Sequence, residues 1–331
     1  MSLLLTCDIK IDKYRFFYAE SIEVESSWQD LGDKCTIKLP NKIVLVQSKD
    51  DSPEKTITAT SIEKTFKTGM KVSVKTGYDN NNELLFEGYI AHIKPNTPIE
   101  IICEDEIYKF KRSAKVNTAY TGTLKGLLNK YFAGVKIDEK LPDVKLSNFM
   151  LKNATQAEIL KELKDAYGFC AYFYASDLYV GLPYFTRKEK RHKFHFQKNI
   201  ISSDLEYKKE EDIRLKAKVV SFLSNNTKIE VEVGDTDGEL KTFHFPSVGE
   251  SDKAKLKTFG EMELKKLKFE GYRGTITTFG IPKVQHSEIV RLYDNRLEER
   301  SGQAYLVDKV KTSWGTGGYR QDIEIARKVS V

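Results

Sequence analysis

Residues 271–328 restrict the fold of this chain more than any other segment. Three strand-like pieces follow one another there, and glycine or proline stands at their corners. These pieces span residues 271–282, 302–310 and 317–328. Since glycine and proline mark turns, the order predicts a glycine-rich strand, a polar connection and a closing hairpin around Gly315 to Gly318. A phosphate-binding loop is a poorer interpretation of these glycines, because no Lys-Ser or Lys-Thr pair follows them.

Residues 4–112 also have the pattern of β-structure. Apolar and polar residues alternate at 22–24 and again at 71–75, which is the period of a half-buried strand. Polar turn clusters at 79–82 and 96–98 separate neighbouring strands. Short strands at this spacing predict a barrel or a sandwich.

The middle of the chain changes to a helical period. Apolar residues at 124–132 fall on one face of a helix. A second helix is predicted over 155–167, because Thr155 and Glu158 form a capping box and Gly168 follows the last turn. An aromatic hairpin at 169–182 completes a small α+β module.

Residues 186–250 return to β-structure, and Asp237-Gly238 predicts a hairpin turn before a strand at 240–245. A third helix is predicted from the capping residue Asp252 to about Phe269. This helix is rich in lysine, carrying Lys253, Lys255, Lys257, Lys265, Lys266 and Lys268. Two interpretations of the lysines stay open: a surface for phosphate groups or an acidic partner, and an ordinary solvated helix face.

These changes of period predict an α+β, mainly β fold, in which two β-barrel-like domains flank a small α+β module. The first β-barrel domain is expected over 1–112. The α+β module with two helices and a hairpin occupies 113–185, and the second β-barrel domain with the Lys-rich helix occupies 186–331.

The composition excludes several classes of protein. Charged residues make up 31% of the chain, and the formal net charge is only +6, without a concentrated basic patch, which disfavours specific nucleic-acid binding. No stretch approaches the ~20 apolar residues that span a bilayer, and no signal peptide is apparent. The cysteines at 7, 35, 103 and 170 are far apart in sequence, so we expect four buried thiols and no zinc site.

Two clusters contain residue types that could carry out chemistry. His192 and His195 could share a metal on a helix, but the alternation with Phe194 and Phe196 predicts a strand on which they point apart. The acids of 104–106 could form an acid–base pair, but a solvated rim at a strand end is the better interpretation. We therefore predict no catalytic, cofactor-binding or metal-binding residue.

Several segments follow one another in an order typical of one family. A strand meets a Gly-Tyr turn at 69–78, an aromatic-Glu-Gly-Tyr strand returns at 85–90, and a capped helix leads into an aromatic hairpin at 155–182. Together with the opening strands at 22–40 and the closing segment at 271–328, they resemble the phage baseplate hub proteins of contractile tails, the late control protein D family. These are related to the hub portion of secretion-system spike proteins.

The resemblance implies a structural baseplate hub protein of a phage or prophage tail, with no enzymatic activity and no cofactor. Such hubs form homotrimers whose ring joins the tail tube to the central spike. The partners implied are other copies of the chain, the tail spike protein, and tail tube and baseplate proteins. The location implied is the virion tail baseplate, after synthesis in the bacterial host cytoplasm.

Other functions stay open at this point. The first alternative is a cell-wall-degrading or carbohydrate-active tail enzyme, which needs an acid pair in a deep pocket. A nucleic-acid-binding barrel would need lysines interleaved with stacking aromatic residues on one face. The hub interpretation itself fits a phage tail and a phage-derived bacteriocin or injection machine equally well.

Overall fold

The computed structural model describes most of the chain. The described residues are 4–40, 42–47, 55–58, 62, 64–138, 140–141, 144–174, 176–181, 190–223, 227–245 and 249–329. Their strands and helices confirm the α+β, mainly β fold. The domain boundary expected at 185–186 lies outside the described residues.

The first β unit comes first in the chain. Its strands are β1 (Leu5–Ile11), β2 (Tyr14–Phe16), β3 (Ser21–Ser27), β4 (Lys34–Leu39), β5 (Lys42–Gln47), β6 (Lys55–Thr58), β7 (Lys71–Tyr78), β8 (Asn81–Lys94) and β9 (Ile99–Glu104). The predicted turn between β7 and β8 is confirmed. Asp79 and Asn80 both have positive φ there, 51° and 64°, a conformation that Asp and Asn accept more readily than most side chains.

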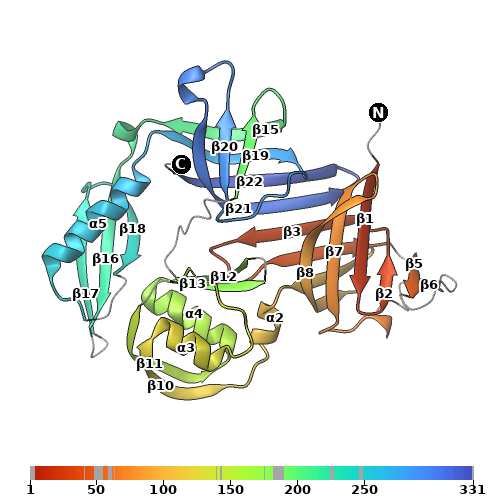
Figure 1. Ribbon diagram of the computed structural model, residues 1–331, viewed down its shortest axis with the longest axis horizontal. Coiled ribbons are helices and arrows are strands. Elements are labelled where there is room, and N and C mark those ends of the chain that lie inside the picture. The colour runs from red at the N-terminus through yellow and green to blue at the C-terminus, as the bar shows by residue number, and fades with distance from the viewer. Residues whose placement is uncertain are drawn as a thin grey trace.

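The helical module follows and lies at the bottom of Figure 1. Its elements are α2 (Ile107–Phe110), β10 (Val116–Thr123), α3 (Leu124–Tyr131), β11 (Lys145–Ala154), α4 (Gln156–Tyr167), β12 (Cys170–Tyr174) and β13 (Asp177–Gly181). Both predicted helices and the hairpin are confirmed. At α4, Glu158 N donates to Thr155 Oγ1 at 3.3 Å, and Thr155 N donates to Glu158 Oε2 at 2.7 Å. Gly168 ends this helix in the left-handed conformation.

The second β unit contains the C-terminal segment of residues 271–328. Its strands are β14 (Arg191–His195), β15 (Ile200–Lys208), β19 (Gly271–Phe279), β20 (Ile289–Tyr293), β21 (Gln303–Gly315) and β22 (Gly318–Lys328). β21 and β22 form the predicted closing hairpin, with Gly315 opposite Gly318. Single turns of 3-10 helix lie at Glu210–Asp212 and Glu298–Arg300.

An insert with its own sheet interrupts the second β unit, at the left of Figure 1. It consists of β16 (Leu215–Phe222), β17 (Lys228–Gly234), β18 (Glu239–His244) and α5 (Lys253–Leu267). The helix predicted from Asp252 is confirmed, since the Asp252 side chain accepts from Ala254 N.

The hairpin predicted at Asp237-Gly238 is wrong. β17 and β18 do not pair with each other, because β16 lies between them, antiparallel to β17 and parallel to β18. The chain turns beneath the start of β16, where a Cβ on Gly238 would lie only 2.5 Å from the carbonyl carbon of Leu215. Glycine is therefore required at position 238 because two backbone segments pass close to each other there, and not because the chain forms a two-residue hairpin.

The two β units share one sheet. Among the described residues, fifteen strands belong to this sheet, and β3 of the first unit pairs with β21 of the second from Ser21↔Gly315 to Ser27↔Lys309. The tip of the β21–β22 hairpin also packs in the first unit's core, where Trp314 and Tyr319 join Ile9, Ile22 and Val74. Unfolding either unit therefore exposes part of the other's core.

Candidate functional site

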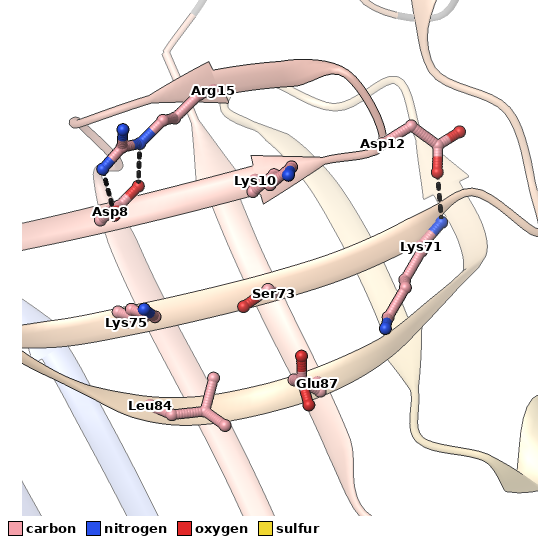
Figure 2. A pocket seen from close by; sticks show the side chains of 9 residues that line it. All are labelled: Asp8, Lys10, Asp12, Arg15, Lys71, Ser73, Lys75, Leu84 and Glu87. Carbon is pink, nitrogen blue, oxygen red and sulfur yellow. Dashed lines mark hydrogen bonds and ion pairs between the residues drawn. The ribbon is translucent and has the colours of Figure 1, made fainter. Parts of the chain in front are cut away.

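A shallow hollow of about 680 Å³ lies on the solvent face of the first β unit (Figure 2). β1 alternates strictly, so that Cys7, Ile9 and Ile11 face the core while Asp8 and Lys10 face the hollow. The turn residue Asp12 and the strands β2, β7 and β8 supply the remaining side chains. The full lining is Asp8, Lys10, Asp12, Arg15, Lys71, Ser73, Lys75, Leu84 and Glu87.

The register of the strands fixes the charge pattern of this hollow. Lys10 of β1 lies directly opposite Arg15 of β2, which places two positive charges side by side. Arg15 forms an ion pair with Asp8, in which Nε donates to Oδ1 at 2.8 Å and Nη2 donates to Oδ2 at 2.7 Å. This pair reduces the repulsion between Arg15 and Lys10 across the two strands. Asp12 is also engaged, because its Oδ1 accepts from Lys71 N at 2.9 Å.

Three ammonium groups are left over in the hollow. Lys10, Lys71 and Lys75 have no ion-pair partner in the part of the chain that the structure describes. Ser73 is the one hydroxyl in the lining, and no described base is hydrogen-bonded to it. The arrangement can form ion pairs and hydrogen bonds with a charged surface, and it lacks the nucleophile–base pair of an acyl-transfer site.

The acids of residues 104–106 do not all form the solvated rim that was expected, and for Asp105 that prediction is wrong. The Asp105 side chain is buried, and its oxygens accept from Asp33 N at 2.9 Å and from Ile107 N at 3.0 Å. Burial raises the pKa of Asp105 to about 7, although these two hydrogen bonds oppose the shift. Burial and the neighbouring Asp105 charge also raise the pKa of Asp33 well above its ordinary value.

The flanking acids Glu104 and Glu106 are engaged in ordinary surface contacts. Glu104 pairs with Lys111 at 2.6 Å, and Glu106 pairs with Lys109 at 3.0 Å. Glu106 also accepts from the Tyr89 hydroxyl at 3.0 Å. Lys109 belongs to α2, Lys111 follows its last residue and Tyr89 belongs to β8. The two acids therefore hold α2 beside β8 and do not converge on an open pocket.

A lysine from the second β unit joins it to the first. Lys283 Nζ donates to the backbone carbonyls of Leu84 at 2.8 Å and Leu85 at 3.1 Å. Burial lowers the pKa of Lys283, while the charge of Asp33 raises it in part. Lys283 thus ties the second β unit to the backbone of β8 in the first.

The histidines lie as the strand interpretation predicts, in β14. His192 Nε2 lies 2.7 Å from Glu288 Oε2, and Tyr174 donates to the other oxygen of Glu288 at 2.6 Å. His195 stacks on Tyr293, with ring centroids 4.7 Å apart. Burial raises the pKa of Glu288, but the hydrogen bonds from His192 and Tyr174 prevail and lower it. This network fastens the β12–β13 hairpin to the second β unit.

A serine–histidine pair beside this network was missed by sequence reasoning. His286 Nδ1 lies 3.2 Å from Ser287 Oγ, and Ser287 has a φ of 66°. Both side chains are 1% exposed, and Ser287 donates to the Tyr172 hydroxyl at 3.1 Å. A substrate cannot reach this pair, so its place in the structure is that of a packed, hydrogen-bonded core element.

The four cysteines are free and buried, as expected. Two of them are neighbours in space although they are far apart in the sequence: Cys35 of β4 lies directly opposite Cys103 of β9. Burial raises the pKa of both thiols, which keeps them protonated and unreactive.

No group of three or more His, Cys, Asp or Glu side chains in the described ranges is placed to hold a metal ion. None of the described helices combines the length and the apolar character that crossing a membrane requires.

Comparison with known families places the chain. Its residues 36–307 match the family model described as the Alg8 N-terminal domain. The chain belongs to this family. The description of the Alg8 N-terminal domain family names no reaction and no substrate. No curated protein matches the sequence.

Solved structures show which fold this member of the Alg8 N-terminal domain family has. The tail protein from Neisseria meningitidis MC58 is 12% identical with a TM-score of 0.64, over 99% of this chain and 97% of that one. The prophage MuSo2 43 kDa tail protein from Shewanella oneidensis is 15% identical with a TM-score of 0.55, over 97% and 98%. A type VI secretion system component from E. coli is 10% identical with a TM-score of 0.54, over 100% and 78%.

At these identities the likeness establishes the fold. The fold of this chain is that of phage tail proteins and of a secretion-system component whose similarity to T4 bacteriophage tail proteins has been described. The resemblance to baseplate hub proteins that the sequence indicates is confirmed at this level.

Proposed function

We propose that this protein is a structural hub of a tail baseplate, built as a ring that joins the tail tube to the central spike. The observation that carries the proposal is the end-to-end match with the tail protein from Neisseria meningitidis, which covers 99% of this chain and 97% of the other. The alternative of a cell-wall-degrading tail enzyme needs an acid pair in a deep pocket. Glu104 and Glu106 are instead paired with Lys111 and Lys109, and Asp105 is buried, which supports a structural role.

The ring consists of three copies. Residues 1–112, 113–185 and 186–331 are its structural units, and the two β units of each copy give six similar elements around the axis. A closed ring needs heterologous contacts between different surfaces of neighbouring copies, and two β units in tandem supply such surfaces. The partners are other copies, a spike protein, and tail tube and baseplate proteins, within the virion tail.

The charged hollow of Figure 2 is one surface suited to such contacts. Its ammonium groups Lys10, Lys71 and Lys75 lie on an open sheet face, where ion pairs fix orientation and speed association more than they add affinity. We expect assembly through this face to weaken as ionic strength rises, because exposed ion pairs are screened by salt.

Light scattering over a concentration series tests the ring, together with cryo-electron microscopy of the intact particle. We expect a trimer at high concentration and a position on the central axis of the tail. A stable dimer, or a position away from the axis, contradicts the proposal. In a dye-release assay on peptidoglycan we expect no lysis, and lysis that disappears in Glu104→Gln or Glu106→Gln would instead support the enzyme.

A further inference from the structure

A second cleft, of about 430 Å³, lies where the insert meets the helical module and both β units. The first β unit contributes Trp28, which follows β3, and the module contributes residues at the end of α4 and the start of β12. β18 and α5 of the insert and β22 of the second β unit complete the lining. The volume lies within the range of ~300–1,000 Å³ that is typical of binding pockets.

Aromatic side chains from three parts of the chain form an apolar floor in this cleft. They are Trp28, Phe169, Phe243 and Phe259. Phe169 and Phe243 are buried, and Trp28 is held in place because its Nε1 donates to Asp308. Such fixed rings bind an apolar or aromatic group with little loss of conformational entropy.

Cationic side chains stand around this floor. The lining contains Lys164, Lys241, Lys266 and Arg327 against the single acid Glu263. Glu263 pairs with Lys266, and Glu239, which lies outside the lining, pairs with Lys241. Lys164 Nζ donates to the carbonyl of Gln29, which carries no charge, so the lining still carries an excess of positive charge. His244 adds none near neutral pH, because burial lowers its pKa while its Nδ1 lies 3.2 Å from the Ala166 carbonyl oxygen.

We propose that this cleft binds an acidic segment of a partner protein, with an aromatic or aliphatic side chain flanked by carboxylates. Charge complementarity selects the carboxylates, and the aromatic floor selects the anchor between them. The cations stand on four separate elements, α4, β18, α5 and β22. An extended segment with several carboxylates reaches more of them than a single small anion does. This assigns a role to Lys266 of the Lys-rich helix and is independent of the tail function.

Tryptophan fluorescence offers a direct test, because the chain has two tryptophans. Trp314 is buried in the core of the first β unit, so Trp314→Phe leaves Trp28 as the reporter. The probes are the blocked tripeptides Glu-Phe-Glu, Lys-Phe-Lys and Glu-Ala-Glu, with phenylacetate as a small anion. We expect saturable change with Glu-Phe-Glu alone, and a Kd that rises at least tenfold between low salt and 0.5 M salt as charges are screened.

Charge reversals on one helix give the matched comparison. Lys266→Glu is expected to weaken Glu-Phe-Glu binding at least tenfold, whereas Lys257→Glu, on the same helix outside the cleft, leaves it unchanged. Equal loss in both variants, or none in either, overturns the proposal. So does binding of Lys-Phe-Lys or Glu-Ala-Glu as tight as that of Glu-Phe-Glu. Binding of phenylacetate as tight as the peptide would assign the cleft to small molecules and also overturn the proposal.

Discussion

Among single residues, Asp105 has the clearest measurable consequence. Its pKa of about 7 in the folded protein lies above the ~3.9 of an unfolded chain. Between these values the folded state binds more protons than the unfolded state, so the free energy of unfolding falls as pH rises from about 4 to 7. We expect a loss on the order of 3 kcal/mol, which chemical denaturation across this pH range can measure.

An amide at this position removes the proton from the balance. Asp105→Asn is expected to flatten the slope between pH 6 and 7. At pH 4 it lowers stability by about 1–3 kcal/mol, because one backbone N–H loses its acceptor, and this deficit shrinks as pH rises, because only the wild type then loses stability. Asp308→Asn is the control. Burial raises the pKa of Asp308 only to about 6, so this group contributes less than Asp105 to the slope between pH 6 and 7, and most of that slope should remain in the variant. A full slope between pH 6 and 7 in Asp105→Asn would assign the effect to the neighbouring Asp33, whose pKa is also raised.

The sequence could place Asp105 at a strand end but could not reveal its burial. That burial depends on Asp33, whose N–H meets the carboxylate from 72 positions away. The facing cysteines 35 and 103 show the same limit, because cross-strand neighbours are set by register between distant segments. The charged hollow was also missed, since its residues come from four strands and a turn that only the sheet brings together.

At the scale of the element, helix propensity and packing predict opposite effects for a substitution of Gly260 in α5. Replacing an interior helical glycine by alanine ordinarily stabilises a helix by ~1 kcal/mol. Here an added Cβ would lie 2.7 Å from Val233 Cγ2 and 2.8 Å from Val219 Cγ2, and overpacking of this kind costs ~1–3 kcal/mol. We expect Gly260→Ala to destabilise the protein by about 1–2 kcal/mol in chemical denaturation. Gly317→Ala, with nothing within 4 Å of the added Cβ, should change stability little, and a stabilised Gly260→Ala would contradict the packing of α5 on β16 and β17.

Elements with strong local signals were predicted correctly. Capping by Thr155 and Asp252 and the period of the apolar residues were sufficient for α4 and α5. The order of the insert's strands was not, because a short connection between β17 and β18 is equally compatible with a hairpin and with a crossing beneath β16. Which one forms depends on β16, a strand earlier in the chain, and local turn chemistry carries no information about it.

At the scale of the whole molecule, the structure divides into a shared sheet and a separate insert, and the two should open differently. β3 is paired on both sides, with β4 and with β21, so each of its amides can exchange only when one of these two pairings opens. Among the described residues, the insert's sheet joins no strand of the large sheet. Its own core clusters are small, and Val220 and Phe222 at the end of β16 pack in the core of the helical module. Local opening costs less where fewer apolar contacts must break.

In hydrogen–deuterium exchange of the full chain at pH 7, we therefore expect β16, β17 and α5 to exchange at least tenfold faster than β3 and β21. Gly260→Ala should accelerate exchange in the insert alone, because the insert can open while the shared sheet stays closed. Equal rates in both regions, or acceleration of β3 in that variant, would mean that the insert and the shared sheet unfold as one cooperative unit.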